Sequence, residues 1–236
     1  MATIKKNGRS RLDRGTLTRS SIIEAALRIM DESGESKLTF ARLGQQLGSS
    51  PSAMYRHFSN RDEIIEALGD DLIRISLDGY APSASWEDSL WDLAVRAWRT
   101  YELHPAVASQ TYFRVTRGPH ELKAVDAILQ ALSAAGLSED EAVTHYHLFA
   151  MTVLAQSADH AAKLAAMKAV EVDPTGRWEQ VYVPRDPHEA PYYWAVRDKL
   201  RSRDDYALYR TQIELVIESV RRAVAREVGA VERQES

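Results

Sequence analysis

The stretch from residue 39 to residue 61, TFARLGQQLGSSPSAMYRHFSNR, restricts the possible folds of this chain most strongly. Three apolar residues recur there at helical spacing: Phe40, Leu43 and Leu47. They predict a short helix with one apolar face. Thr39 stands where its hydroxyl can cap the start of that helix, and Gly48 stands where the chain must leave it with a positive φ.

A second short helix is predicted directly after this turn. Ser50 stands at the capping position and Pro51 at the first helical position, where its missing N–H costs nothing. Two short helices joined by a tight turn form a helix-turn-helix, whose second helix enters the major groove of DNA. The alternative is an ordinary helical hairpin.

The rest of the chain also shows helical patterns. Apolar periodicity predicts helices over residues 18–33, 61–78, 85–103, 105–115, 120–135, 138–169, 190–202 and 204–228. Two pairs have the spacing of capping boxes: Asn60 with Glu63, and Ser138 with Glu141. No strand pattern or repeat is found, so an all-α fold is expected.

Three parts are expected along the chain. Residues 1–16 read as a flexible basic arm, residues 17–64 as the helix-turn-helix DNA-binding domain, and residues 65–236 as a helical ligand-binding and dimerisation bundle. Residues 171–191 are rich in proline and predict a long loop that either covers a pocket or reaches a partner subunit.

Composition excludes several classes of protein. The 236 residues are 44% hydrophobic and include no cysteine, which excludes disulfides, thiolate zinc sites and thiol catalysis. No apolar run reaches about 18 residues, so no membrane span is expected. The basic N-terminus is not followed by an apolar stretch, so no secretory signal is expected and the cytoplasm is the expected compartment.

Charge is distributed unevenly. The net charge is −4, yet residues 1–61 hold 11 Lys and Arg against 5 Asp and Glu, and the remainder holds 19 against 29. Residues 1–61 (the basic front) are positively charged and the remainder is negatively charged, which indicates that only the basic front binds a polyanion. The alternative is a solubilising tail.

Residues 17–68, LTRSSIIEAALRIMDESGESKLTFARLGQQLGSSPSAMYRHFSNRDEIIEAL, resemble the DNA-binding domain of the tetracycline-repressor (TetR) family of bacterial transcription regulators. Residues 69–236 resemble the family's C-terminal domain more weakly, and Ser85-Trp86 and AGLSEDEAV (135–143) are similar to the tetracycline-repressor branch. The resemblance implies that the N-terminal helices bind an operator. It also implies that an effector in the C-terminal domain changes the spacing of the two DNA-binding heads.

The resemblance places nine residues near DNA: Thr39, Arg42, Ser49, Ser50, Ser52, Ala53, Tyr55, His57 and Arg61. Most of these suit phosphate contacts, which set register and not sequence. Base reading is expected at the start of the second helix, from Ser49, Ser52, Ala53 and Arg56. Ala41 stands where the family often has a base-reading Arg or Lys, so guanine reading there is not expected. Arg9, Arg11 or Arg14 of the arm is a candidate for the minor groove.

Large side chains cluster in the C-terminal region, where an apolar effector pocket is predicted. Its candidate ligand-binding residues are Trp91, Trp98, Tyr112, Phe113, His145 and Phe149. The alternative is plain core packing, and neither a metal site nor a cofactor is expected. The Asn and Phe with which tetracycline repressors bind their drug fall here on Leu93 and Ala97. A flat or apolar ligand other than tetracycline is therefore expected.

Two long helices predict a homodimer. In residues 138–165 the stripe comprises Tyr146, Ala150, Val153, Leu154, Ser157 and Ala161, and in residues 204–228 it comprises Tyr209, Ile213, Val216, Ile217 and Val220. Two such helices from each subunit make a four-helix bundle across a two-fold axis, which matches a palindromic double-stranded operator. The alternative is that both helices are internal core.

The sequence therefore predicts a ligand-responsive transcriptional repressor with a small-molecule effector. The alternative function is an activator or a ligand-independent regulator of the same fold. An enzyme is not expected, because no phosphate loop or nucleophile elbow is found and the acidic residues fall on solvated helix faces. A helical protein-interaction module would leave the basic front unexplained.

Overall fold

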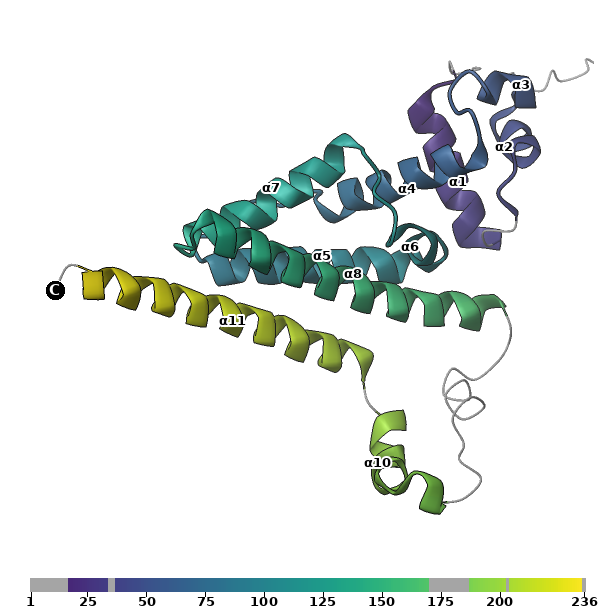
Figure 1. Cartoon of the computed structure of the whole chain (residues 1–236). Coiled ribbons are helices and arrows are strands. Elements are labelled where there is room, and N and C mark those ends of the chain that lie inside the picture. Colours follow the sequence, from purple (N-terminus) through teal and green to yellow (C-terminus); the bar gives the residue numbers. More distant parts are fainter. Residues whose placement is uncertain (1–16, 34–36, 170–186, 203, 235–236) are drawn as a thin grey trace, which may run out of the picture.

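The structure is a computed structural model that describes residues 17–33, 37–169, 187–202 and 204–234. Within these ranges the chain forms helices and no strand, so the predicted all-α fold is confirmed. A small N-terminal head carries α1 to α3, and α4 joins it to a bundle of longer helices (Figure 1). The predicted arm, residues 1–16, lies outside the described residues, as does most of the predicted loop over 171–191.

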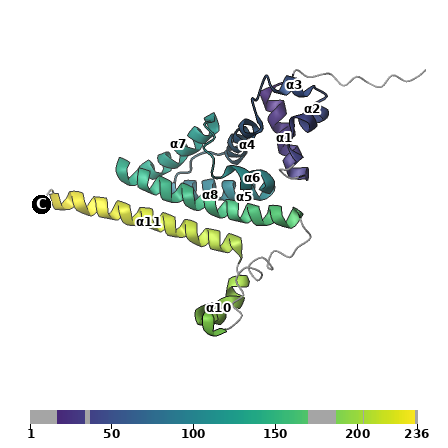
Figure 2. The ribbon, with the colours of Figure 1, turned by 45° about the vertical axis from the view of Figure 1, so that its right-hand side comes forward.

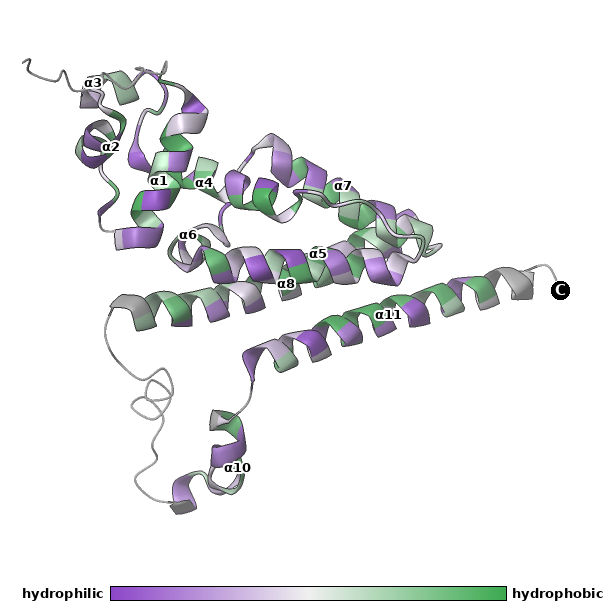
Figure 3. Ribbon diagram, turned by 180° about the vertical axis from the view of Figure 1, so that it is seen from behind, coloured by the Kyte–Doolittle hydropathy of each residue, from purple (hydrophilic) through white to green (hydrophobic). Residues whose placement is uncertain are grey.

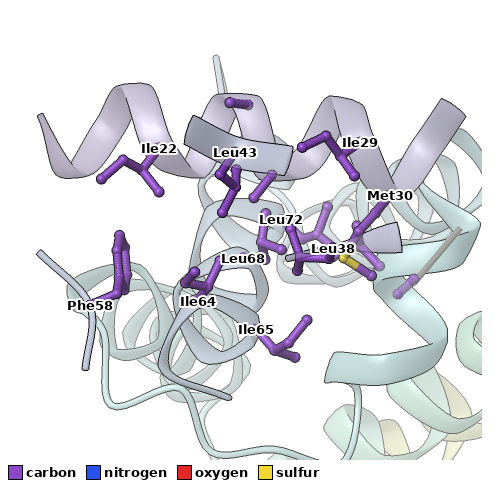
Figure 4. Close-up of a cluster of buried hydrophobic side chains, with 14 of the residues drawn as sticks. Ile22, Ile29, Met30, Leu38, Leu43, Phe58, Ile64, Ile65, Leu68 and Leu72 are labelled. Carbon is purple, nitrogen blue, oxygen red and sulfur yellow. The ribbon is translucent and has the colours of Figure 1, made fainter. Parts of the chain in front are cut away.

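The head is built from α1 (Arg19–Ser33), α2 (Phe40–Leu47), α3 (Pro51–Met54) and the first part of α4 (Arg61–Ser76). Its core is drawn from all four helices and the segments between them: Ile22, Ile29, Met30, Leu38, Leu43, Met54, Phe58, Ile64, Ile65 and Leu68 are nearly fully buried. Figure 4 shows side chains from α1, α2 and α4 pointing toward one another. The apolar stripes predicted from helical spacing therefore form this core.

Helix α4 belongs to both parts of the molecule. Ile64, Ile65 and Leu68 lie in the head core, whereas Ile73 and Leu77, at and just beyond the helix end, line a cavity in the bundle. The domain boundary expected at residue 64 falls inside this continuous helix and stays a prediction.

The bundle consists of α5 (Trp86–Leu103), α6 (Pro105–Thr111), α7 (Pro119–Ala134), α8 (Glu139–Ala169) and α11 (Asp205–Gln234). Helix α8 contacts α5, α6, α7 and α11, and α11 runs along it in two views (Figures 1 and 2). Trp98 is buried in the core of the bundle, where its ring stacks on His160 and on Tyr209 with centroids 4.5 and 4.6 Å apart.

The stripes predicted for the dimer interface lie inside the subunit. Val153, Ser157, Ala161, Tyr209, Ile213 and Val220 are all buried in the single chain. Assigning those faces to a partner is therefore wrong, because the subunit's own helices already cover them. Seen from behind, apolar and polar residues alternate along α11 (Figure 3).

The short η2 (Pro187–Glu189) and α10 (Pro191–Arg201) lie apart from the bundle (Figures 1 and 2). Helix α10 exposes Tyr192, Val196 and Leu200, which repeat at a spacing of four residues. Across the described ranges, no helix is long and apolar enough to cross a membrane.

Candidate nucleic-acid interface and ligand cavity

The predicted turn between α2 and α3 is present, with the expected cap at Thr39 and the expected positive φ at Gly48. The Thr39 hydroxyl accepts a hydrogen bond from the Arg42 N–H at 3.1 Å, and Gly48 has φ 61° and ψ 30°. The Ser49 N–H donates to the Gly44 carbonyl at 2.8 Å. A Cβ at Gly44 would lie 2.6 Å from the Ser49 carbonyl oxygen, so the close approach of the two helices needs glycine at this position.

The second helix of the motif is only one turn long. Helix α3 ends at Met54, and the chain continues through a turn in which the His57 and Phe58 N–H groups both donate to the Met54 carbonyl. Ser50 occupies the capping position, but its hydroxyl makes no cap hydrogen bond and lies 2.9 Å from the Ser52 hydroxyl. The prediction of a side-chain cap at Ser50 is therefore wrong.

Most of the predicted DNA-binding side chains remain accessible. Thr39, Ser50, Ser52, Tyr55 and Arg56 are exposed, whereas Arg42, Ser49, Ala53, His57 and Arg61 are half-buried. The Tyr55 ring is 59% exposed and stacks on Phe40 at a centroid distance of 4.5 Å. Residues 37–61 include no Asp or Glu. This face of the head therefore presents hydroxyls and cations without a fixed negative charge.

Two arginines secure the motif to its surroundings. Arg42 donates to the Ser33 hydroxyl at 2.7 Å, which ties α2 to the end of α1. The Arg19 guanidinium lies over the Phe58 ring, 4.0 Å from its centroid, and donates to the His57 carbonyl at 2.7 Å and to Glu63 at 2.9 Å. The hydrogen bond from the Ser59 N–H and that from Arg19 lower the pKa of the Glu63 carboxyl. Arg19 was not among the predicted site residues, because its partners are 38 and 44 residues away.

A cavity of about 150 Å³ lies in the bundle. Its walls come from α4, α5, α7, α8 and the end of α6, and they are mainly apolar: Leu72, Ile73, Leu77, Leu93, Ala97, Ala124, Val125, Ile128, Phe149, Ala150, Val153 and Leu154. Such a cavity with few polar groups is the usual form of a small-molecule site.

The structure separates the six predicted ligand residues. Tyr112 and Phe149 line the cavity, whereas Trp91, Trp98, Phe113 and His145 do not. Trp98 is buried in the core of the bundle, Trp91 is partly buried against that core, Phe113 is 63% exposed, and the His145 ring lies 2.8 Å from the Glu141 carbonyl. The walls from α4 and α7 were not predicted. For the α4 wall, the available sequence signal was Gly69, a glycine inside an apolar helix. A Cβ at Gly69 would crowd the side chains of Thr111 and Thr116.

A buried carboxylate joins α4 to α7 beside this cavity. Asp70 is 8% exposed and accepts hydrogen bonds from the N–H groups of His120 and Glu121, both at 3.0 Å, and it lies 2.7 Å from the His120 ring nitrogen. A Cβ at Gly118 would collide with the Asp70 carboxylate. Asp70 thus caps the start of α7 from another helix, so the prediction that acidic residues lie on solvated faces is wrong for Asp70.

Two domain families together match most of the chain. The family described as bacterial regulatory proteins, tetR family, matches residues 22–68, and the tetracyclin repressor-like C-terminal domain matches residues 79–217. The HTH-type transcriptional repressor DrrR1 of Streptomyces coeruleorubidus is 26% identical over 136 residues, which cover 57% of this chain and 50% of that protein. The chain thus spans about half the length of this relative. Tetracycline repressor protein class D of Escherichia coli is 34% identical over 76 residues, or 31% of this chain and 35% of that repressor.

Solved structures share the fold. The transcriptional regulator SCO7222, a TetR from Streptomyces coelicolor, superposes with a TM-score of 0.67 at 25% identity, over 88% of this chain and 99% of that one. The TetR family protein ActR of the same organism, in complex with actinorhodin, superposes with a TM-score of 0.70 at 20% identity, over 87% of this chain and 95% of that one. The second likeness shows the fold alone.

Proposed function

Because this chain belongs to the TetR family of bacterial transcription regulators, we propose that it is a repressor that binds a palindromic DNA operator as a homodimer and is released by a small apolar effector. DrrR1 is named a repressor, and ActR is named in complex with actinorhodin. Both names support the proposal of a repressor that responds to a small molecule.

The observation that carries the DNA-binding part is the accessible polar face of the head. Ser50, Ser52 and Arg56 project from the start and end of α3 without an acidic neighbour in residues 37–61. Hydroxyls and arginines are the groups that contact phosphates and base edges. The stacking of Tyr55 on Phe40 holds one more donor in a fixed position.

The proposed dimer face is the outer side of α8 and α11. Leu148, Thr152, Gln156, Gln212 and Leu215 line a shallow groove between these helices, and Leu148 and Leu215 are 45% and 64% exposed. Met151, on the same helix as Leu148, is 64% exposed. A second copy would cover these apolar side chains across a two-fold axis.

The proposed effector site is the cavity beside α4. Leu93 and Ala97, which stand where tetracycline repressors carry an Asn and a Phe, both line it, so the ligand is proposed to be other than tetracycline. Helix α4 connects the two activities, because it contributes Leu72 and Ile73 to the cavity and Ile64 to the head core. A coupling of about 1–3 kcal/mol through this helix changes operator affinity roughly 5- to 150-fold.

Selection from a random DNA duplex library tests the DNA-binding part. The expected product is a palindrome whose half-sites lie about one helical turn apart. Arg56→Ala is expected to weaken binding to the selected duplex by about 1–3 kcal/mol and to relax the sequence preference at one position of each half-site. The matched control is Arg222→Ala, an exposed arginine of α11 paired with Glu218 at 3.0 Å, which should leave DNA binding unchanged. Failure to enrich any two-fold symmetric sequence would exclude the proposed operator mode.

Sedimentation tests the dimer. Leu148→Glu combined with Leu215→Glu is expected to give a helical monomer, because it places charges on both sides of the proposed interface. Val196→Glu on α10 serves as the comparison and also asks whether α10 contributes to assembly. A wild-type chain that sediments as a monomer at micromolar concentration would contradict the proposal.

A further inference from the structure

Tyr101 is the most unusual polar group of the cavity. Its side chain extends from α5 and lines the cavity, and the residue is only 7% exposed. For its hydroxyl, no hydrogen-bond partner is found among the residues that the structure describes, and the oxygen is not fully enclosed by protein, so the O–H is available to an acceptor from outside the chain. Burial raises the pKa of Tyr101 further above its ordinary value, so the hydroxyl stays a hydrogen-bond donor even in alkaline solution.

A second buried tyrosine shows what the usual arrangement looks like. Tyr209 is 1% exposed, and its hydroxyl donates to the Ala94 carbonyl at 2.7 Å. Leaving a buried hydroxyl unpaired costs free energy that a ligand acceptor would recover. The difference between the two tyrosines therefore indicates that the partner of Tyr101 is supplied from outside the chain.

The charged groups of the cavity are already engaged. Arg114 and Glu121 are the charged residues among the described ones that line it. The Arg114 guanidinium donates to the Gln110 carbonyl at 3.2 Å and to Asp62 at 3.4 Å. Glu121 accepts hydrogen bonds from the Thr116 hydroxyl and the Arg117 N–H, both at 2.8 Å. An ionised ligand would thus find no unpaired countercharge, and its desolvation would not be compensated.

We propose that the effector is an uncharged, mainly apolar ring compound, and that Tyr101 recognises it by donating a hydrogen bond to a carbonyl or ether oxygen. This inference rests on the proposed function, because it specifies the ligand of the same cavity. The remaining ring surface lies against the apolar walls, which include Leu72 and Ile73 of α4. A cavity of about 150 Å³ suits one or two rings, since an apolar protein cavity of similar volume takes up benzene.

Matched small molecules test the hydrogen bond directly. The probes are 1-tetralone, its hydrocarbon counterpart tetralin, which lacks the oxygen, and the anion 1-naphthoate. Calorimetric titration of the full chain is expected to show 1-tetralone binding about two- to tenfold more tightly than tetralin, as one hydrogen bond in a buried site allows. The anion 1-naphthoate is expected to bind most weakly of the three.

Tyr101→Phe removes the donor while keeping the ring. The variant is expected to bind tetralin as the wild type does and to lose the preference for 1-tetralone. Its melting temperature should stay close to that of the wild type, because the hydroxyl that is removed makes no hydrogen bond to the described residues. Tyr209→Phe is the matched control: it should keep the preference for 1-tetralone but melt at a lower temperature, because its hydroxyl has a partner.

Three results would overturn the inference. They are a ketone preference that persists in Tyr101→Phe, a 1-naphthoate affinity equal to that of 1-tetralone, and a lack of binding by both neutral probes at millimolar concentration. A gel shift on the selected operator without any probe separates this failure from failure of the proposed function. If the probes bind as expected and the wild type fails to shift any duplex, the ligand class stands and the regulatory role does not.

Discussion

The helix caps of the head come from neighbouring residues, whereas two helices of the bundle, α7 and α8, are capped from a distant helix. In the head, Thr39 accepts the N–H of Arg42 and Asn60 accepts that of Glu63, so each cap lies within three residues of its partner. In the bundle, α7 is capped by Asp70, about 50 residues away on α4. The Ser138 N–H before α8 donates to Glu227 of α11 at 3.0 Å, and the Ser138 hydroxyl donates to the same carboxylate.

This difference explains why the caps of the head can be predicted from local sequence, whereas the capping partners of α7 and α8 cannot. A cap within one turn is encoded in four consecutive residues, whereas a cap from another helix exists only after the helices pack. The long-range contact of Asp70 also joins α4, which enters the head, to α7, which forms a cavity wall. Four predictions test this comparison, in order of decreasing effect on the free energy of unfolding.

Asp70→Ala should cause the largest loss. It leaves the His120 and Glu121 N–H groups without their acceptor in a buried site, so the free energy of unfolding should fall by about 3 kcal/mol. Urea unfolding measures this. Asp62→Ala is the matched control, because Asp62 also reaches from α4 to the segment after α6, through Arg114 at 3.4 Å, but is 69% exposed. Its loss should stay below about 1 kcal/mol, and equal losses would contradict a special role for the buried cap.

Gly44→Ala should destabilise the head by about 2 kcal/mol and abolish DNA binding. Alanine is favoured in helices, but here its Cβ would lie 2.6 Å from the Ser49 carbonyl oxygen, so the turn must move. Gly48→Ala meets no atom within 4 Å and carries only the cost of φ 61°, about 1 kcal/mol. Thermal unfolding and a gel shift compare the two variants. A larger loss for Gly48→Ala would show that backbone conformation, and not close packing, limits this turn.

Thr39→Ala should cost about 1 kcal/mol, the usual value of a helix cap. Ser50→Ala, at the equivalent position of α3, should cost almost nothing, because its hydroxyl makes no cap hydrogen bond. Denaturant unfolding of both variants measures the contrast. A loss at Ser50 as large as that at Thr39 would mean that Ser50 does cap α3 in solution.

Asp205→Asn should have the smallest effect, and a pH-dependent one. Burial on its own would raise the pKa of Asp205, but hydrogen bonds from Lys163 and His160 outweigh it and lower that pKa below the usual 3.8. A carboxyl with a lowered folded-state pKa contributes stability above its unfolded-state pKa and loses it as the pH falls through the folded-state value.

The wild type should therefore exceed Asp205→Asn in free energy of unfolding at neutral pH by less than about 1 kcal/mol, since the pair is partly exposed. The gap should close as the pH falls below about 4. Glu214→Gln, 62% exposed on the same helix, supplies the baseline. A gap that stays constant down to acid pH would show that the charge of Asp205 contributes nothing.

Much of the fold was predictable because it depends on spacing. The observed bounds of α1, α5, α8 and α10 lie within one or two residues of those expected from apolar periodicity and caps, and α5 begins after Ser85, whose hydroxyl accepts the Asp88 N–H. One of the two hydrogen bonds of the capping box predicted at Asn60 and Glu63 is confirmed. Asn60 accepts the Glu63 N–H, but the Glu63 carboxylate reaches the Ser59 N–H instead of that of Asn60.

The capping box predicted at Ser138 and Glu141 is wrong, because both residues have other partners. Ser138 donates hydrogen bonds to Glu227, and the Glu141 carboxylate lies beside His145 and Arg226. Trp98, one of the candidate ligand residues, lies away from the cavity for a similar reason. Trp98 has the size expected of a ligand-binding residue, yet the neighbouring rings of His160 and Tyr209 already cover it. Size and helical face are local properties, whereas access to a cavity depends on what packs opposite.

By itself, the sequence determined that the chain is helical, where most helices begin and end, and that its basic, acid-free turn is the part suited to DNA. These features follow from interactions among residues within one or two turns of each other. Only the tertiary structure decided that the long apolar stripes of α8 and α11 face inward, that Asp70 completes a distant helix, and that Tyr101 reaches a cavity with its hydroxyl unpaired. These depend on which helices meet, because burial and hydrogen-bond partners are set by contacts between residues far apart in the chain.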